Sequence, residues 1–142
     1  MSDRRLAIEA WESLFRAQYE IFAKLACDFS GASLYQAEYD VLLTLSRAPD
    51  RTARLRDITN NMLISQPSVS RLVDKMVARG LVTKEPDPDD GRGSLVTATE
   101  DGLRDFRALA ITHGRHIASR MSALSEDELR ALKALTQKLR EG

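Results

Sequence analysis

The sequence predicts a mainly helical chain with one small β-hairpin, an α+β fold formed by a single domain over residues 1–142. Three observations predict this fold class. Apolar residues recur at three- and four-residue steps over most of the chain, which is the helical period. Two β-capable runs enclose a stretch rich in Pro, Asp and Gly near residue 90, which is the pattern of a hairpin. A length of 142 residues fits one compact domain rather than two.

The first predicted helix runs from about Arg4 to Asp28. Its apolar face is wider than a single neighbouring element requires, which indicates burial against a second chain. Ser30 and Gly31 interrupt the helical pattern, and a second helix follows over about residues 35–47, with Tyr39, Leu42, Leu43 and Leu45 facing inward.

The segment from Leu63 to Val82 carries the clearest pattern in the chain. Ser65 is a favourable N-cap, and Pro67 is tolerated in a first helical turn. Gly80 supplies the C-terminal stop. At 100° per residue, one side of this helix is apolar and the other is polar, short-chained and partly basic. The apolar side holds Val69, Leu72, Val73 and Met76, and the outer side holds Pro67, Ser70, Arg71, Asp74, Lys75 and Ala78.

A short predicted helix near Arg56–Met62 precedes this segment, so the pair forms a helix-turn-helix. A major groove about 12 Å wide admits one helix, and small residues near its N-terminus allow close approach to the base edges. Arg71 and Lys75 are long enough to reach guanine edges or phosphates, although Lys75 and Arg79 have the alternative of only complementing the helix dipole. The predicted DNA contacts of this helix are Ser65, Gln66, Pro67, Ser68, Ser70, Arg71, Lys75 and Arg79.

The predicted hairpin pairs residues 81–85 with residues 94–98 and makes a wing. Its expected tip, residues 91–93, presents Arg92 as a cation suited to a narrow minor groove. Asp90 either holds the Arg92 guanidinium as an ion pair or simply ends the turn.

Two more helices follow the hairpin. Thr99 caps the first, and acidic residues suit its first turn. The second opens with a capping box formed by Ser125 and Glu128. One apolar stripe along this last helix holds Leu129, Leu132, Leu135 and Leu139.

The charge of the chain is zoned, although its net charge is zero. Residues 51–79 hold six basic and two acidic residues, a local surplus of +4, whereas acids gather in residues 87–90 and 126–128. No apolar run approaches the ~20 residues of a membrane span, and the N-terminus is too polar for a signal peptide, so we expect a cytoplasmic protein with no membrane partner. No Ser/His/Asp or Cys/His set and no phosphate-cradling glycine loop is present, so neither an enzyme nor a cofactor is expected.

The single cysteine, Cys27, excludes an intrachain disulfide. It lies beside apolar residues at the end of the first helix, so a buried, inert thiol is favoured over a redox sensor. His113 and His116 lie three apart in a helix, but zinc needs three or four ligands, and no metal site is predicted. The sequence does not decide whether these three residues sense a signal.

Taken together, these motifs resemble the multiple antibiotic resistance regulator (MarR) family. The resemblance is carried by L-I-S-Q-P-S-V-S-R-L-V-D-K-M, then G-L-V, then D-P-D-D-G-R-G, with Thr99 and Gly102 after the second strand. It covers about residues 55–102, and the flanking helices agree in length and order. It implies a triangular homodimer in which about residues 1–34 and 103–142 form dimerisation helices and about residues 35–102 form a winged helix-turn-helix.

The resemblance also implies a function. Members of the family bind a pseudo-palindromic double-stranded DNA operator, usually as repressors, and a small aromatic or phenolic effector, or an oxidant, typically relieves the binding. Asp90 and Arg92 match the acid and arginine of the family's wing tip. The groove-facing helix of the family is matched by Ser65, Gln66, Pro67, Ser68, Ser70 and Arg71. Trp11, Phe15 and Tyr39 are weak candidates for an effector pocket, with aromatic core packing as the alternative.

The chain departs from the family pattern at three positions. Gly91 stands where a second basic residue is frequent, Thr59 where a small alanine is usual, and Ala98 where a larger apolar residue is usual. These departures predict a weaker grip on DNA without a change of fold. Two alternatives follow: a winged-helix protein-interaction module without DNA binding, or a redox- or metal-responsive regulator. The operator, the regulated genes, the effector and the choice between repression and activation are not encoded in these patterns.

Overall fold

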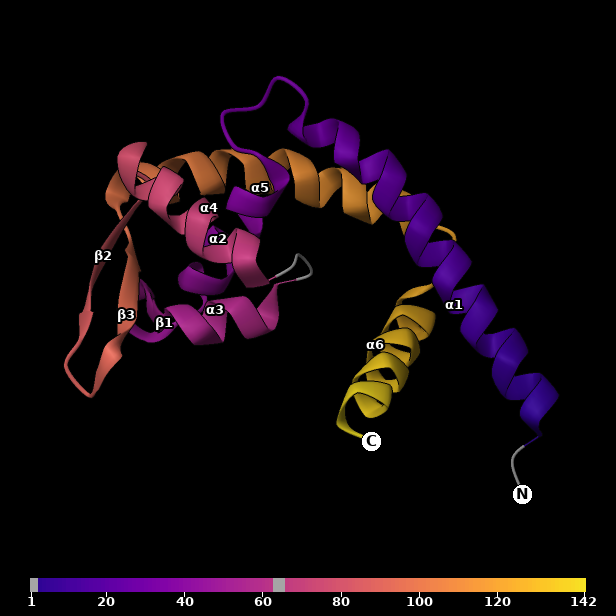
Figure 1. The fold of residues 1–142 in the computed structure, drawn as a ribbon. Helices are drawn as coiled ribbons and strands as arrows, with labels where there is room; N and C mark the ends of the chain where they lie inside the picture. The colour runs from indigo at the N-terminus through magenta and orange to yellow at the C-terminus, as the bar shows by residue number, and fades with distance from the viewer. Residues whose placement is uncertain (1–2, 63–65) are drawn as a thin grey trace. The chain divides into compact units, whose positions relative to one another are not determined.

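The computed structural model of the chain describes residues 3–62 and 66–142. Its contacts divide the chain into two compact units, unit 1 (Met1–Leu25 and Thr112–Gly142) and unit 2 (Ala26–Ile111). The long helix α5 (Glu100–Arg120) contributes residues to both units (Figure 1). The boundaries predicted between the dimerisation helices and the DNA-binding part differ from the boundaries of these two units. The predicted division by function stays a prediction.

Unit 2 combines helices with a small antiparallel sheet, which confirms the predicted fold class. Besides the part of α5 up to Ile111, it contains η1 (Ala26–Phe29), α2 (Gln36–Ser46), η2 (Pro49–Arg51), β1 (Thr52–Arg54), α3 (Leu55–Asn61), α4 (Gln66–Ala78), β2 (Val82–Asp87) and β3 (Asp90–Ala98).

The sheet has the order β1-β3-β2, so the wing hairpin carries a third strand that the sequence did not predict. The strand β1 has only three residues and no alternating apolar pattern, so no period-2 signal marks it. It pairs antiparallel with β3, with Thr52 opposite Thr97 and Arg54 opposite Leu95. The hydroxyl oxygens of Thr52 and Thr97 lie 2.8 Å apart and share a hydrogen bond, which ties the strand to the wing.

The core of unit 2 forms where α2, α3, α4 and α5 pack with the sheet. Val69, Val73 and Met76 of α4 are fully buried, which confirms the apolar side predicted for this helix. In α2 the predicted inward face is confirmed, because Leu42 and Leu45 belong to the core and the half-buried Tyr39 and Leu43 pack against it. The fully buried positions of α2 are Glu38, Val41, Leu42 and Leu45.

The start of α5 is joined closely to the end of α4. The Thr99 hydroxyl accepts a hydrogen bond from the Gly102 N–H (3.0 Å), which confirms the predicted cap, and donates to the Gly80 carbonyl (2.6 Å). Gly102 lies so near the backbone that an added Cβ would stand 2.1 Å from the Leu81 carbonyl oxygen. Only glycine permits this approach of helix to backbone.

Unit 1 consists of α1 (Arg4–Leu25), the remainder of α5 and α6 (Glu126–Glu141). The predicted capping box of α6 is confirmed, since Ser125 and Glu128 exchange hydrogen bonds of 2.9 and 3.2 Å. Neither α1 nor α6 buries any residue fully. Their exposed large apolar side chains are Leu6, Ile8, Trp11, Phe15, Tyr19, Phe22, Leu129, Leu135 and Leu139. In residues 3–62 and 66–142, no helix has the length and apolar character needed to traverse a bilayer.

Candidate DNA-binding interface

The outer face of α4 is exposed from Ser68 to Ala78. Because Val69, Val73 and Met76 point into the core, the opposite side of the helix faces outward. The exposed side chains on this face include Ser68, Ser70, Arg71, Asp74, Lys75 and Ala78. The predicted contact Ser65 lies outside the described residues, whereas Gln66 and Pro67 open the helix.

Two cations on this face are left without an opposite charge. Among the residues that the structure describes, neither Arg71 nor Lys75 takes part in an ion pair. The acid on the same face, Asp74, is bound instead by Lys84 of β2 at 3.0 Å. The positive charge of Arg71 and Lys75 is therefore directed to solvent, where phosphates would meet it.

The wing differs from the prediction at its tip. The turn consists of Pro88 and Asp89, and residues 91–93 belong to β3 rather than to the turn. The ladder extends this far because Asp87 pairs with Asp90, which leaves a two-residue connection. The predicted tip was therefore wrong, and Arg92 is presented by a strand.

Asp90 supports the wing through the backbone. Its carboxylate accepts a hydrogen bond from the Arg92 N–H at 3.1 Å, and within the described chain no ion pair joins it to the Arg92 guanidinium. The same carboxylate lies against Gly93, where an added Cβ would stand 3.0 Å from Asp90 Oδ2. Of the two interpretations of Asp90, the structure favours the local, turn-forming one.

An ion pair with a buried carboxylate fixes the turn end of the wing. Asp87 is 4% exposed, and its Oδ2 lies 3.0 Å from Arg54 Nε of β1. Asp87 Oδ1 accepts the Asp89 N–H (2.9 Å), and Arg54 also approaches Asp89 at 3.7 Å. Sequence reasoning missed this pair because its partners lie 33 residues apart and the strand β1 was not predicted. The pair holds the turn of the wing in a defined position.

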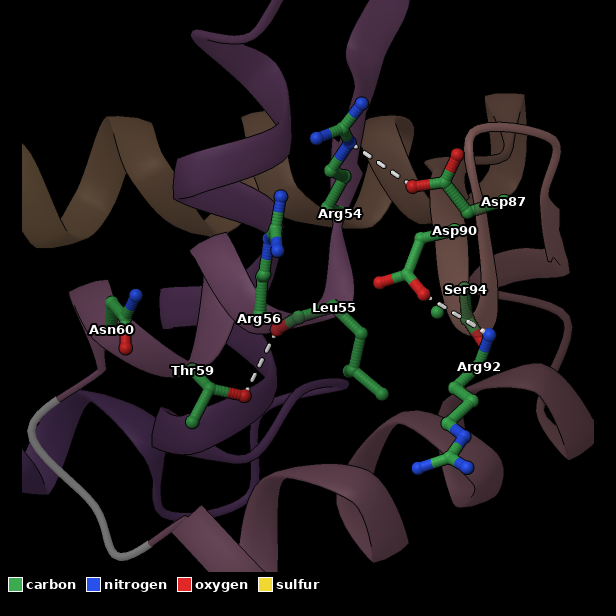
Figure 2. A pocket seen from close by; sticks show the side chains of 10 residues that line it. Arg54, Leu55, Arg56, Thr59, Asn60, Asp87, Asp90, Arg92 and Ser94 are labelled. Carbon is green, nitrogen blue, oxygen red and sulfur yellow. Dashed lines mark hydrogen bonds and ion pairs between the residues drawn. The ribbon is translucent and has the colours of Figure 1, made fainter.

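A groove of about 380 Å³ separates α3 from the wing, and its walls carry further cations. Figure 2 shows Arg56 on the α3 wall and Arg92 on the wing wall, with Leu55 between them and Asn60 beyond Arg56. Neither Arg56 nor Arg92 forms an ion pair with any described residue. Sequence reasoning counted Arg56 in the local charge surplus but did not place it in the site.

Arg79 was predicted as a DNA contact, and the structure gives its guanidinium internal partners. It donates hydrogen bonds to both carboxylate oxygens of Glu38 and to the Ser33 carbonyl oxygen (2.7 Å). A DNA contact by Arg79 stays a prediction, but most of its donors are engaged inside unit 2.

The candidate effector residues fall in different units. Trp11 and Phe15 lie in α1, with ring centroids 5.7 Å apart, and both are exposed in the single chain. In unit 2 the ring of Tyr39 packs on Phe106 (4.9 Å) and Phe29 (5.4 Å), and burial raises the pKa of its phenol above 10.0. Tyr39 therefore fits the core-packing alternative, and the effector pocket stays a prediction.

The structure places Cys27, a candidate sensing residue, at the surface. Cys27 is exposed, so the expectation of a buried thiol was wrong. The physical reason is that α1 ends at Leu25 and Cys27 lies in the short turn of η1, where its side chain no longer follows the apolar face of the helix. Over the described ranges, no group of three or more His, Cys, Asp and Glu side chains is arranged to hold a metal ion.

Three comparisons with known proteins agree on HTH-type transcriptional regulators, and two of them name the MarR family. A sequence profile of the MarR family matches residues 34–93. The chain is 28% identical over 129 residues to YkoM, an uncharacterized HTH-type transcriptional regulator of Bacillus subtilis (strain 168), covering 84% of this chain and 82% of that protein. The DNA complex of Sco3205, a MarR family transcriptional regulator from Streptomyces coelicolor, has a TM-score of 0.84 at 20% identity, over 100% of this chain and 90% of that one. BpsR of Bordetella bronchiseptica, whose DNA binding is regulated by 6-hydroxynicotinic acid, has a TM-score of 0.78 at 25% identity, over 92% of each chain.

The fold is a winged helix-turn-helix, and the family match and the curated relative identify a DNA-binding transcriptional regulator. Over residues 34–93 the chain is similar to the MarR family of transcriptional regulators, as the sequence motifs indicated. Because that family is not enzymatic, the prediction that the chain is not an enzyme is confirmed.

Proposed function

We propose that this protein is a ligand-responsive repressor that binds a pseudo-palindromic operator as a homodimer, in the cytoplasm. Each protomer inserts α4 into a major groove, and the two half-sites lie about 34–36 Å apart. The observation that carries the proposal is the outer face of α4, where Arg71 and Lys75 are exposed and unpaired among the described residues.

The contacts divide by their chemistry. The short side chains of Ser68 and Ser70, in the first turns of α4, approach base edges, and Arg71 reaches guanine or phosphate. Arg92 enters the minor groove, and its orientation depends on Asp90, which binds its backbone. Arg56, across the groove from Arg92, adds a phosphate contact that the sequence motif did not suggest.

The homodimer is supported by the surface of unit 1. Trp11 is 60% exposed, Tyr19 65%, Leu135 61% and Leu139 69%. Monomeric soluble proteins seldom expose contiguous apolar patches larger than a few hundred Å². Unit 1 also contains an apolar groove of about 860 Å³ lined by α1, α6 and the segment between α5 and α6. A second copy of the chain would cover these surfaces, and the twofold axis would match a pseudo-palindrome.

The effector class is proposed as a small aromatic or phenolic acid. The support is the regulation of BpsR by 6-hydroxynicotinic acid and the row of aromatic side chains Trp11, Phe15 and Tyr19 along α1, which would lie at the edge of the proposed dimer contact. Aromatic rings of this kind offer stacking surfaces to a flat ligand. Release of a bound duplex by 6-hydroxynicotinic acid or salicylate, and not by alanine at the same concentration, would support this class.

The proposal is tested by fluorescence anisotropy with a random-sequence duplex at low salt, followed by selection of a preferred duplex from a random pool. Non-specific binding is expected, and the logarithm of the affinity should fall linearly with the logarithm of the salt concentration because phosphate contacts release counterions. The selected duplex should contain two related half-sites. No binding to any duplex at low salt would instead support the protein-interaction alternative.

A further inference from the structure

A buried carboxylate lies between the beginning of α2 and the end of α4. Glu38 is only 2% exposed, although it is charged. Its Oε1 accepts a hydrogen bond from the Tyr35 N–H at 2.8 Å, so one side of the carboxylate closes the first turn of α2. A carboxylate in such a place needs a compensating charge, because an isolated buried charge is strongly unfavourable.

Arg79 supplies this charge from the end of α4. It is the first residue after the helix, and its own N–H still donates to the Lys75 carbonyl (3.0 Å). Its Nη1 donates to both oxygens of Glu38, and its Nη2 donates to the Ser33 carbonyl oxygen (2.7 Å). The hydrogen bond with Glu38 raises the pKa of Arg79, so the guanidinium stays charged at every working pH.

The aromatic ring of Tyr35 adds a further contact to the same group. The guanidinium carbon of Arg79 lies 5.7 Å from the ring centroid, within the range of a cation–π interaction. Arg79 therefore contacts Ser33 and Tyr35, which precede α2, and Glu38 in its first turn. A surface ion pair is worth little, but removal of Arg79 would leave the buried carboxylate of Glu38 without a compensating charge.

The position of this junction matters for the recognition helix. Arg71 and Lys75 lie eight and four residues before Arg79, or about 12 Å and about 6 Å along the helix axis. If the end of α4 moved, the side chains that face DNA would move with it. A tilt of about 10° over about 12 Å shifts Arg71 by about 2 Å, which is enough to break a bidentate contact with a base.

We propose that the Glu38–Arg79 pair is a positioning device that fixes the end of α4 against the first turn of α2 and so sets the angle at which the recognition helix meets DNA. Arg79 then acts on DNA through the orientation of Arg71 and the short polar residues, and is not itself a contact. This inference rests on the proposed function, and it predicts that the pair governs specific binding while leaving non-specific binding intact.

Two single variants separate positioning from direct contact. Glu38→Gln keeps an oxygen for the Tyr35 N–H but removes the charge that holds Arg79. If only the charge mattered, the loss of one negative charge would tighten DNA binding. If the pair positions α4, the same substitution weakens binding to the selected operator. If α4 then holds the competent orientation a tenth of the time, operator affinity falls about tenfold. Arg79→Lys keeps the charge but loses the fork that bridges Glu38 and Ser33, so it should lower operator affinity in the same direction.

The measurements are anisotropy titrations of the selected operator and of a random duplex of about 30 bp at low salt. For both variants the random-duplex affinity should stay within about twofold of the unaltered protein. Glu85→Gln is the matched control, because it removes one exposed carboxylate from the same unit and should weaken neither affinity. The double variant Glu38→Gln/Arg79→Lys should lose no more operator affinity than the more strongly affected single variant, since both act through one pair.

Operator affinity that is unchanged or increased in Glu38→Gln would overturn the proposal. An equal loss on operator and random duplex in Arg79→Lys would also overturn it, because Arg79 would then be a phosphate contact. Hydrogen exchange without DNA gives an independent readout if a variant is poorly stable. The amides of the last two turns of α4 should exchange faster in Glu38→Gln, whereas those of α3 should not. Unchanged exchange in α4 would refute positioning even if the protein bound no DNA at all.

Discussion

At the scale of single residues, the partner of each arginine decides what that arginine is free to do. The two buried carboxylates among the described residues, Glu38 and Asp87, each bind one arginine, Arg79 and Arg54. A buried carboxylate without a compensating charge is strongly unfavourable, so these two arginines have a structural role. Arg71, Arg92 and Arg56 have no such partner in the described chain and are left for phosphates. Composition predicted the basic surplus, but only contacts separate its structural members from the others.

Replacement of Arg92 by alanine tests the wing. We expect operator affinity to fall about tenfold, about 1.4 kcal/mol, because one cation leaves the minor groove. The slope of log affinity against log salt should decrease by about 1. Arg107→Ala, which removes an exposed arginine of α5, serves as the control and should change neither quantity. If Arg92→Ala binds like the unaltered protein, the wing assignment fails.

Asp40 offers a test by pH. Its carboxyl is half-buried in α2, and desolvation by burial raises its pKa above the ordinary value of 3.8. The folded chain therefore binds more protons than the unfolded chain between the two values, so stability is lost as pH rises through the raised pKa. Asp40→Asn should raise the Tm at neutral pH, and the difference from the unaltered protein should disappear at a pH below the ordinary value. An equal Tm at neutral pH would contradict this assignment.

At the scale of elements, sequence patterns predicted the helices better than the sheet. The 3.6-residue period and the caps at Thr99 and Ser125 are local signals, and α4, α5 and α6 begin where these signals place them. The strand β1 and the extent of the wing are set by pairing with β3, which no local pattern records. The same reason explains the missed Arg54–Asp87 pair, whose members are distant in sequence.

The joint between α4 and α5 depends on the glycine at position 102. An alanine there would place its Cβ 2.1 Å from the Leu81 carbonyl oxygen, so the helix must move away from the backbone. We expect Gly102→Ala to lower the free energy of unfolding by about 1–3 kcal/mol, as overpacking does in other cores. Gly114→Ala is the matched control in the same helix, where an added Cβ meets nothing within 4 Å, and alanine should stabilise the helix by about 0.5–1 kcal/mol. Urea unfolding measures both, and a neutral Gly102→Ala would refute the close approach.

At the scale of the whole molecule, the two units differ in how completely each buries its apolar residues. Unit 2 has a core of fully buried side chains, including Leu42, Ile58 and Val96. Neither α1 nor α6 of unit 1 has a buried residue, although both are amphipathic. The sequence of the first helix already predicted an apolar face wider than one neighbouring element needs. The structure shows this excess as exposed apolar side chains on α1. This contrast supports the proposal that unit 1 is completed by a second copy.

Leu135 is the position at which this proposal is most directly tested. Its side chain is 61% exposed on α6, so Leu135→Glu should not disturb the single chain, but in a dimer it would place a carboxylate in an apolar interface at a cost of several kcal/mol. We expect the dimer to dissociate at micromolar concentration in sedimentation equilibrium, and operator affinity to fall steeply because each half-site must then be bound separately. Gln137→Glu adds the same charge to an exposed position of the same helix and should leave both properties unchanged. Because non-specific binding depends on α4 of each protomer, Leu135→Glu should still bind random duplex at low salt. A variant that remains dimeric would exclude this face of α6 from the interface, and loss of random-duplex binding would show that DNA contact depends on assembly as well as on the recognition helix.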